Sequence, residues 1–286
     1  MAVTSTSPRF PHACNVVLGG TLYEGLRVAF TVTRSCKPEP NVLELEVSNL
    51  SADTRAQIKG PTKGSPGTTV LLNAGYVGTL ALLYAGNVRT VRTAKDAATI
   101  TTHLTAGDGD WAYSGATISA SLSQGAGLTQ VLQQLGPAMG VDVSQALAIA
   151  AQADAAAGAP RFSRGWVGSG KASVEVTKAL NRFGLTWSIQ EGKLQVLEAA
   201  KALPGTAVLL TPDTGLLGSP EPNDAVDSRV PKLTTLRCLL DPTIRPGTLL
   251  QVEATFLKGL FKAQTVKHQG DTHGSTWETQ VQATAL

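Results

Sequence analysis

Three turn-rich stretches in the last third of the chain decide its fold class: Gly215-Leu-Leu-Gly-Ser-Pro-Glu, Leu239-Leu-Asp-Pro-Thr-Ile-Arg-Pro-Gly and His268-Gln-Gly-Asp-Thr-His-Gly-Ser-Thr-Trp. Glycine accepts positive φ, proline fixes φ, and Asp and Ser cap turns through their side chains. None of the stretches holds a nucleophile beside a base or a cradle for a phosphate. Each therefore predicts a β turn that holds two strands in place.

The segments around these turns alternate between apolar and polar residues, as half-buried strands do. The clearest is 42–50, in which Leu43, Leu45 and Val47 face one way. Ser51 then precedes a short helical turn that it can cap. Further strands are predicted over 15–20, 26–33, 70–76, 79–88, 99–105, 233–240, 249–256, 261–268 and 277–284. Short strands at this spacing are typical of a sandwich or barrel.

The pattern changes to an α+β one between the two β regions. Apolar residues follow helical spacing from Leu128 to Met139, although Pro137 predicts an earlier end to the regular helix. The Ala-rich stretch 144–160 is compatible with a weak helix or with a linker. Ser173 can cap a second helix that ends near Gly184, and a hairpin follows with its turn at Glu191-Gly192. The order along the chain is therefore β domain, α+β domain, β domain.

Composition excludes several classes of protein. The 286 residues are 42% apolar and 16% charged, with 29 glycines and 15 prolines, which is too hydrophobic for disorder. A low fraction of charged residues in a chain of this size predicts that partner proteins cover much of its surface. The net charge is +3 and the basic residues are scattered, so we expect no nucleic-acid footprint.

The three cysteines are spaced neither for zinc nor for a disulfide framework, so Cys14, Cys36 and Cys238 are expected to be thiols in a reducing compartment. The start of the chain lacks the apolar region of a signal peptide, and the longest apolar runs are too short for a membrane helix. We expect synthesis in the host cytoplasm and no membrane insertion.

The ordered set of turns and strands resembles the baseplate hub proteins of tailed bacteriophages, which share their fold with the N-terminal part of type VI secretion spike proteins. The resemblance covers most of 40–286, and 144–160 departs from it. Four groups of residues carry it: Val47-Ser-Asn-Leu-Ser-Ala-Asp-Thr-Arg with Asn73-Ala-Gly-Tyr and Tyr84-Ala-Gly-Asn-Val; Gly168-Ser-Gly-Lys-Ala with the hairpin ending in Gly192-Lys-Leu-Gln-Val-Leu; Thr214-Gly-Leu-Leu-Gly-Ser-Pro; and Leu240-Asp-Pro-Thr-Ile-Arg-Pro-Gly-Thr with Lys267-His-Gln-Gly-Asp-Thr-His-Gly-Ser-Thr-Trp.

The resemblance implies an α+β, mainly β fold with two tube-type β-barrel domains, 1–106 and 206–286, around a small α+β domain, 107–205. It also implies a structural, non-enzymatic virion protein of the tail baseplate. Three subunits would form a pseudo-sixfold ring that adapts the hexameric tail tube, or a distal tail protein, to the trimeric spike. DNA and the tape-measure protein would pass through its channel, and no cofactor is implied.

Two other classes remain as alternatives. A tail-associated cell-wall hydrolase would use Asp108 and Asp110 for acid/base chemistry and Trp111 and Tyr113 for sugar stacking, although a domain junction explains this cluster better. A type VI-like spike component would continue into a repetitive β-helix, which the chain does not contain.

The remaining motifs favour structural roles. His268, Asp271 and His273 have the residue types of a metal site, but a capped turn between two strands explains all three and is the preferred interpretation. The spacing from Gly165 to Lys171 matches a phosphate loop, yet Ala172 replaces the magnesium-binding hydroxyl, so we expect this loop to begin the second helix. Catalytic and metal residues are expected to be absent. The predicted interface or anchor residues are Trp111, Trp166, Trp277, His268 and His273.

Overall fold

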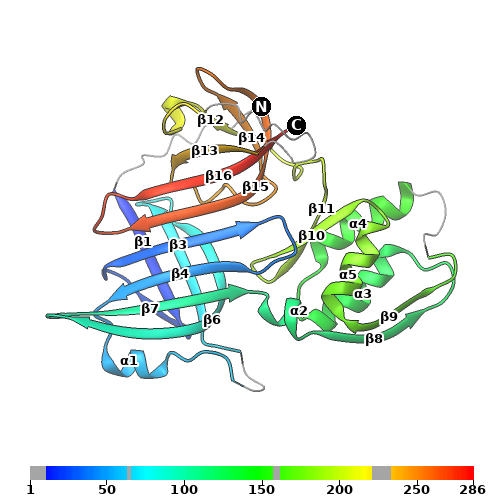
Figure 1. Ribbon diagram of the computed structural model, residues 1–286, viewed down its shortest axis with the longest axis horizontal. Helices are drawn as coiled ribbons and strands as arrows, with labels where there is room; N and C mark the ends of the chain where they lie inside the picture. Colours follow the sequence, from blue (N-terminus) through cyan, green and yellow to red (C-terminus); the bar gives the residue numbers. More distant parts are fainter. Residues whose placement is uncertain (1–10, 63–65, 157–161, 221–232) are drawn as a thin grey trace. The chain divides into compact units, whose positions relative to one another are not determined.

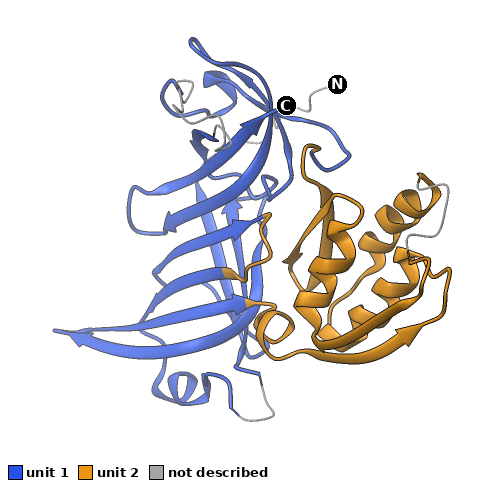
Figure 2. Ribbon diagram, turned by 45° about the vertical axis from the view of Figure 1, so that its right-hand side comes forward, with its two compact units in different colours: residues 1–35, 42–107, 202–286 blue, residues 36–41, 108–201 orange. Residues whose placement is uncertain are grey.

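The computed structural model describes residues 11–62, 66–156, 162–220 and 233–286 (Figure 1). These residues form two compact units (Figure 2). Unit 1 comprises 1–35, 42–107 and 202–286, and unit 2 comprises 36–41 and 108–201. The described part of the chain is α+β and mainly β, as predicted.

Unit 1 is built on one sheet in which antiparallel neighbours predominate. Its paired strands follow the order β12-β14-β15-β3-β4-β7-β6-β5-β1-β2, and β16 pairs with β15 and with β13. The strands are β1 (His12–Leu18), β2 (Thr21–Tyr23), β3 (Val28–Ser35), β4 (Asn41–Ser48), β5 (Thr69–Tyr76), β6 (Ala81–Asp96), β7 (Thr99–Asp108), β12 (Val208–Leu210), β13 (Leu233–Leu239), β14 (Leu249–Glu253), β15 (Lys258–Asp271) and β16 (Trp277–Ala285).

The early and late strands of unit 1 join where β15 pairs with β3. β15 continues the sheet because its second half pairs with β3 on one side and with β16 on the other. Among the described strands the path of pairing stays open from β12 to β2 and does not close into a barrel. Two separate groups of buried side chains nevertheless pack on this sheet, one mainly from β1–β7 and one from β12–β16.

Cross-strand register shows how the buried face is filled at the junction. Leu45, Phe30, Gly270 and Trp277 are consecutive partners across β4, β3, β15 and β16. The rings of Phe30 and Trp277 meet edge to face with centroids 5.5 Å apart. A Cβ atom at Gly270 would lie 2.5 Å from the Phe30 ring and 2.7 Å from the Trp277 ring. Glycine is required there because two aromatic rings occupy its side-chain space.

Two short helical segments punctuate unit 1. α1 (Ala52–Gln57) begins as predicted at Ser51, whose hydroxyl oxygen accepts a hydrogen bond from the Thr54 amide. The second is the 3₁₀ turn η1 (Pro212–Thr214), which ends at Gly215 with a φ of 101°. A side-chain cap satisfies amides that a helix start leaves without partners, so each segment has a defined beginning.

Unit 2 packs three helices and a short helical turn against two separate two-stranded sheets. One sheet pairs β8 with β9 across an intervening segment that holds two helices, and the other is the β10–β11 hairpin. The elements are α2 (Asp110–Ser114), β8 (Thr117–Leu122), α3 (Leu128–Met139), α4 (Ser144–Ala156), β9 (Trp166–Lys171), α5 (Ala172–Asn181), β10 (Leu185–Gln190) and β11 (Lys193–Glu198). Their common core is mainly aliphatic, with the aromatic side chains of Phe162, Trp166 and Trp187.

Three predictions for unit 2 were wrong in detail. α3 continues through Pro137 to Met139, because the burial of Leu135 and Met139 holds the last turn in place although proline there cannot donate the usual backbone hydrogen bond. Trp166–Lys171 is a strand and not part of a loop that begins α5. α5 begins at Ala172, and the Ser173 hydroxyl donates to the Tyr113 carbonyl oxygen instead of capping the helix.

The Ala-rich stretch resolves into helix α4 up to Ala156, and 157–161 lie outside the described residues. Small residues let α4 approach closely, and Ala146 and Ala150 are fully buried. Asp154 explains the position of this helix. Its carboxylate accepts from the amides of Leu128 and Thr129 at 2.8 and 3.0 Å, and thus caps the N-terminus of α3 from a neighbouring helix.

Candidate interaction surfaces

The turn between β15 and β16 is a capped reversal, as predicted from its residue types. The Asp271 carboxylate accepts from the His273 amide at 2.9 Å and from the Arg27 guanidinium at 2.9 Å. His268, by contrast, lies on the buried face of β15. In the part of the chain that the structure describes, no three His, Cys, Asp or Glu side chains are grouped to hold a metal ion.

Burial determines the chemistry of His268. Its ring Nδ1 lies 2.9 Å from the Thr279 hydroxyl, and the side chain is fully buried. Loss of hydration lowers the pKa of His268 to about 3, and the charge of Arg34 acts in the same direction. The imidazole is therefore neutral near neutral pH, and it packs in the interior of unit 1.

The predicted anchor residues divide into buried and exposed ones. Trp166 and Trp277 are 6% and 4% exposed, and Trp277 stacks on His12 with ring centroids 4.5 Å apart. These two tryptophans and His268 serve packing within the chain. Trp111, with 67% of its side chain exposed, and His273, in the exposed turn, have surface left for a partner.

Asp108 holds a backbone turn. Its carboxylate accepts from the amides of Glu191 and Gly192 at 2.6 and 3.1 Å and from the Asn41 amide group at 3.2 Å. Glu191 and Gly192 have φ values of 56° and 74°, which is the positive-φ hairpin turn that the sequence predicts. A buried carboxylate with three donors is committed to structure, and Asp110 instead starts α2. The two carboxylates do not converge in a cleft.

The outer face of the sheet over β1, β2 and β5 carries an apolar row beside the polar pair Asn15 and Asn73, and sequence analysis missed this row. Val17 is the partner of both Leu22 and Leu71, and Leu71 is the partner of Ala85. Directly opposed residues share a face, so these four side chains form one row, which we call the apolar row. Leu22 is 53% exposed and Leu71 is 37% exposed. Only the register between strands reveals this row, since each strand alone shows an ordinary alternation.

Farther along the sheet, beyond β6 and β7, the outer face over β4, β3, β15 and β16 is polar. Glu44, Thr31, Gln269 and Glu278 are consecutive partners across β4, β3, β15 and β16. A parallel row runs through Thr33, Lys267, Gln280 and Arg237. The Arg237 guanidinium lies 2.7 Å from the Glu278 carboxylate, so the rows carry nearly balanced charge. We call these two rows the polar face.

A second exposed apolar group lies at the other end of the sheet. Phe256, in the turn between β14 and β15, is 65% exposed, and Leu260 and Leu286 are 47% and 53% exposed. The Leu286 amide donates to the Leu260 carbonyl oxygen at 3.0 Å, so these two residues are neighbours. Exposed apolar groups of this kind mark contact surfaces when they cluster.

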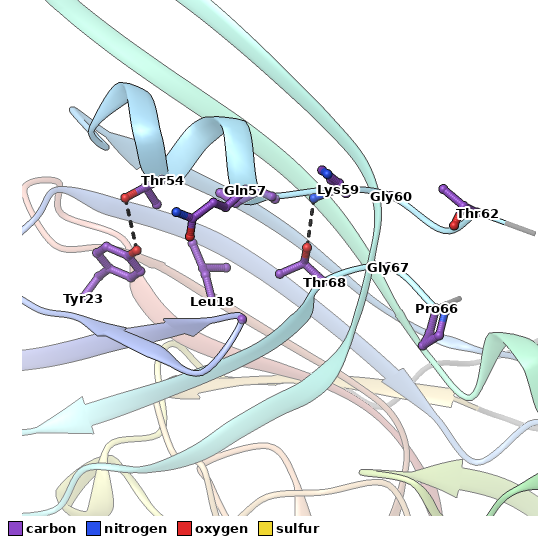
Figure 3. A pocket seen from close by; sticks show the side chains of 12 residues that line it. Leu18, Tyr23, Thr54, Gln57, Lys59, Gly60, Thr62, Pro66, Gly67 and Thr68 are labelled. Atoms are coloured by element: carbon purple, nitrogen blue, oxygen red, sulfur yellow. Dashed lines mark hydrogen bonds between the residues drawn. The ribbon is translucent and has the colours of Figure 1, made fainter. Parts of the chain in front are cut away.

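A pocket of about 380 Å³ lies between α1 and the start of β5 (Figure 3). Its polar groups bind one another: the Tyr23 hydroxyl donates to Thr54 at 3.2 Å, and the Lys59 amide donates to Thr68 at 2.9 Å. No carboxylate or histidine is among its lining residues. The arrangement has the character of a packing defect under a short helix and offers no acid/base pair.

Comparison with solved structures identifies the fold. The chain is similar to the 43 kDa tail protein of prophage MuSo2 from Shewanella oneidensis, with a TM-score of 0.63 and 14% identity over 96% of this chain and 97% of that one. It is similar to the tail protein from Neisseria meningitidis MC58, with a TM-score of 0.65 and 9% identity over 96% and 97% of the two chains. The c3393 protein of E. coli, a type VI secretion component with structural similarity to the T4 tail proteins gp27 and gp5, gives a TM-score of 0.62 and 8% identity over 95% and 76%.

These likenesses establish that the chain has the fold of phage tail proteins, which type VI secretion components share. No protein-family model and no curated protein matches the sequence. None of the helices in the described ranges is long and apolar enough to cross a lipid bilayer.

Proposed function

We propose that the chain is the homotrimeric hub of a phage tail baseplate, a structural virion component. The observation that carries the proposal is the fold likeness to two phage tail proteins over almost the whole length of each chain. In this proposal 1–106 and 206–286 act as two related barrel-type domains around 107–205. Three subunits then supply six such domains, enough to adapt a hexameric tail tube to a trimeric spike.

Two regions on the outer face of the sheet, the apolar row and the polar face, support the proposal of a ring of subunits. The apolar row is suited to contact with another subunit, because it would lose water on assembly. The group formed by Phe256, Leu260 and Leu286 lies elsewhere on the same sheet. A contact between two different surfaces is heterologous, and heterologous contacts close into rings when the rotation permits.

The polar face is suited to line a channel. Binding to DNA requires lysines and arginines that neutralise phosphates. In the polar face Arg237 is paired with Glu278, and Lys267 is offset by Glu44. Such a surface would stay hydrated and would let DNA or the tape-measure protein pass without binding it tightly.

A type VI-like spike component is the second candidate, favoured by the likeness to the E. coli secretion component. Both candidates are trimers in this proposal and differ in their partners. A cell-wall hydrolase is not supported, because Asp108 is bound to backbone amides and does not face Asp110.

The mass of the purified chain in solution tests the proposal. Light scattering over a range of concentrations should give three times 29.6 kDa. A monomer at every concentration would contradict the trimeric hub.

A further inference from the structure

We propose that the edge of β9 in unit 2 binds an extended, acidic segment of a partner protein, which adds a third strand to the β8–β9 sheet. The inference does not depend on the hub function. It rests on the direction of the β9 backbone groups, on the uncharged edge between Trp166 and Gly170 and on the charges of the groove beside it.

The register of the β8–β9 pair shows which backbone groups of β9 point away from β8. The Ala172 amide donates to the Ala116 carbonyl oxygen, and the next pairs along the ladder are Gly170 with Ile118 and Gly168 with Ala120. Backbone groups alternate in direction along a strand, so those of Val167 and Ser169 point away from β8. Within the described residues no further strand pairs on this side, since the sheet has two strands.

β9 lacks the features that normally protect a sheet edge. Natural edges carry charges, proline or bulges that block pairing with another chain. Between Trp166 and Gly170 the strand has no charge and no proline. Gly168 and Gly170 are required within unit 2, because a Cβ atom at Gly168 would lie 2.5 Å from the Trp166 ring and Gly170 has a φ of 99°. Together with Ser169 they leave this stretch of the edge without large side chains.

A groove of about 370 Å³ lies where an added strand would run. Gly165 and the β9 residues Trp166, Val167 and Ser169 line one side of it. Val167 and Ser169 are the two β9 residues whose backbone groups point away from β8. One face of α5 forms the opposite wall, with Glu175, Lys178, Ala179 and Arg182, and Phe162 contributes one aromatic ring. The groove thus combines a free strand edge with helix side chains, which is the arrangement of β-strand addition.

The charges of the wall select an acidic segment. Glu175 is buried, and its carboxylate lies 2.8 Å from the Lys178 ammonium group, so it is already paired. The Arg182 guanidinium lies over the Phe162 ring, 5.1 Å from its centroid, and keeps its positive charge. Lys171 and Arg164 are exposed at either end of β9. The cations exceed the single carboxylate, so a partner carboxylate would be attracted.

The exposed side chain of Val167 adds an apolar contact. It is 71% exposed, the highest value among the large apolar side chains in the described ranges. A residue opposite Val167 in an added strand would share its face and cover it. The occupant is therefore an extended segment in which small apolar residues alternate with Asp or Glu.

A peptide probe tests this occupant on the full chain. The probe is a fluorescein-labelled Val-Glu-Val-Glu-Val-Glu peptide with blocked ends, followed by fluorescence anisotropy. A second peptide carries N-methyl groups on alternate residues, and a third has Lys in place of Glu. We expect binding of the first peptide, at least about tenfold weaker binding of the N-methylated one, because hydrogen bonds are lost, and no binding of the Lys peptide.

Two proline variants localise the site. Ser169→Pro removes an amide that points away from β8, whereas Ser119→Pro removes the amide of its register partner on the opposite edge. Both positions are exposed, so they are matched in exposure and residue type. Ser169→Pro should weaken binding about tenfold and Ser119→Pro should leave it unchanged. Arg182→Gln should also weaken binding of the Glu peptide.

Hydrogen exchange gives the direct readout. The amides of Val167 and Ser169 should gain protection when the Glu peptide is added. Absence of binding up to about 1 mM, equal binding of the N-methylated peptide, or equal effects of the two proline variants would overturn the proposal. Protection of these amides in the chain alone, rising with its concentration, would also overturn it, because a second copy would then be the occupant.

Discussion

At the scale of single residues, the buried face of unit 1 depends on groups that are kept out of it, a side chain at Gly270 and a proton on His268, as well as on direct contacts. At Gly270 any side chain would clash with the rings of Phe30 and Trp277. His268 occupies a fully buried core position with a neutral ring. A histidine kept neutral inside a core makes stability depend on pH, because the unfolded chain takes up a proton that the folded chain refuses.

We predict that His268 destabilises the protein on acidification. Its pKa falls from 6.5 in the unfolded chain to about 3 in the folded one. Between these values the unfolded state binds more protons, so the free energy of unfolding should fall by up to about 1.4 kcal/mol per pH unit as pH decreases. The stabilisation is complete above pH 6.5 and lost progressively towards pH 3.

Urea unfolding at a series of pH values measures this slope, with His268→Gln as the comparison. Glutamine can still meet Thr279 but takes up no proton in this range. The difference in free energy of unfolding between wild type and His268→Gln should shrink as pH falls from about 6.5 to 4.5. The window stops there because Asp271, whose pKa the Arg27 hydrogen bond lowers, contributes stability that is lost only at lower pH. Parallel curves for the two proteins would contradict the assignment.

Among the elements, the capping of α3 by α4 explains how an Ala-rich helix acquires a fixed place. α4 has a weak apolar stripe, with Ala146 and Ala150 as its buried residues. The three hydrogen bonds of Asp154 to Leu128 and Thr129 add a directional contact to this weak packing. Polar capping therefore replaces the large apolar side chains that usually orient a helix.

We predict that Asp154→Ala lowers the free energy of unfolding of unit 2 by about 1–2 kcal/mol, because two amides at the start of α3 lose their acceptor. Asp154→Asn should restore part of the loss, since an amide oxygen still accepts. Gln152→Ala, on the exposed side of the same helix, is the control. Hydrogen exchange at Leu128 and Thr129 should accelerate in the alanine variant alone, and unchanged exchange would refute the cap.

Elements with a strong local pattern could be predicted from the sequence. β4 alternates cleanly, and the positive-φ turn at Glu191 and Gly192 has the residue types that such a turn demands. β9 escaped prediction because glycine and serine dominate its second half. β8 alternates Ile118, Ala120 and Leu122 with polar residues, and the sequence analysis missed this short pattern. Their pairing depends on contacts between segments about 50 positions apart, which a local pattern cannot encode.

For unit 1 as a whole, the sequence does not show the register in which the strands pair. The sequence predicts most of its strands, yet the apolar row and the polar face appear only when partners are known across β1, β2, β5 and across β3, β15, β16. A shift of one residue would exchange the faces of a strand. The surface that we propose for subunit contact therefore follows from pairing and not from any single segment.

Assembly through the apolar row predicts a specific loss of the trimer. Leu71→Glu places a charge in the middle of the row, beside Val17 and Ala85. An uncompensated charge in a subunit contact should raise the dissociation constant at least about a hundredfold, because the carboxylate loses its hydration on assembly. Light scattering should then show a monomer that keeps the thermal midpoint of the subunit, since Leu71 faces outward.

The matched control is Gln282→Glu, which adds the same charge on the outward face of β16. If that face borders a water-filled channel, the added carboxylate stays hydrated and the trimer persists. Dissociation by both variants would mean that net charge, not position, disrupts the assembly. A trimer that survives Leu71→Glu with unchanged affinity would move the subunit contact away from β1, β2 and β5, and would leave the Phe256, Leu260 and Leu286 group as the surface to alter next.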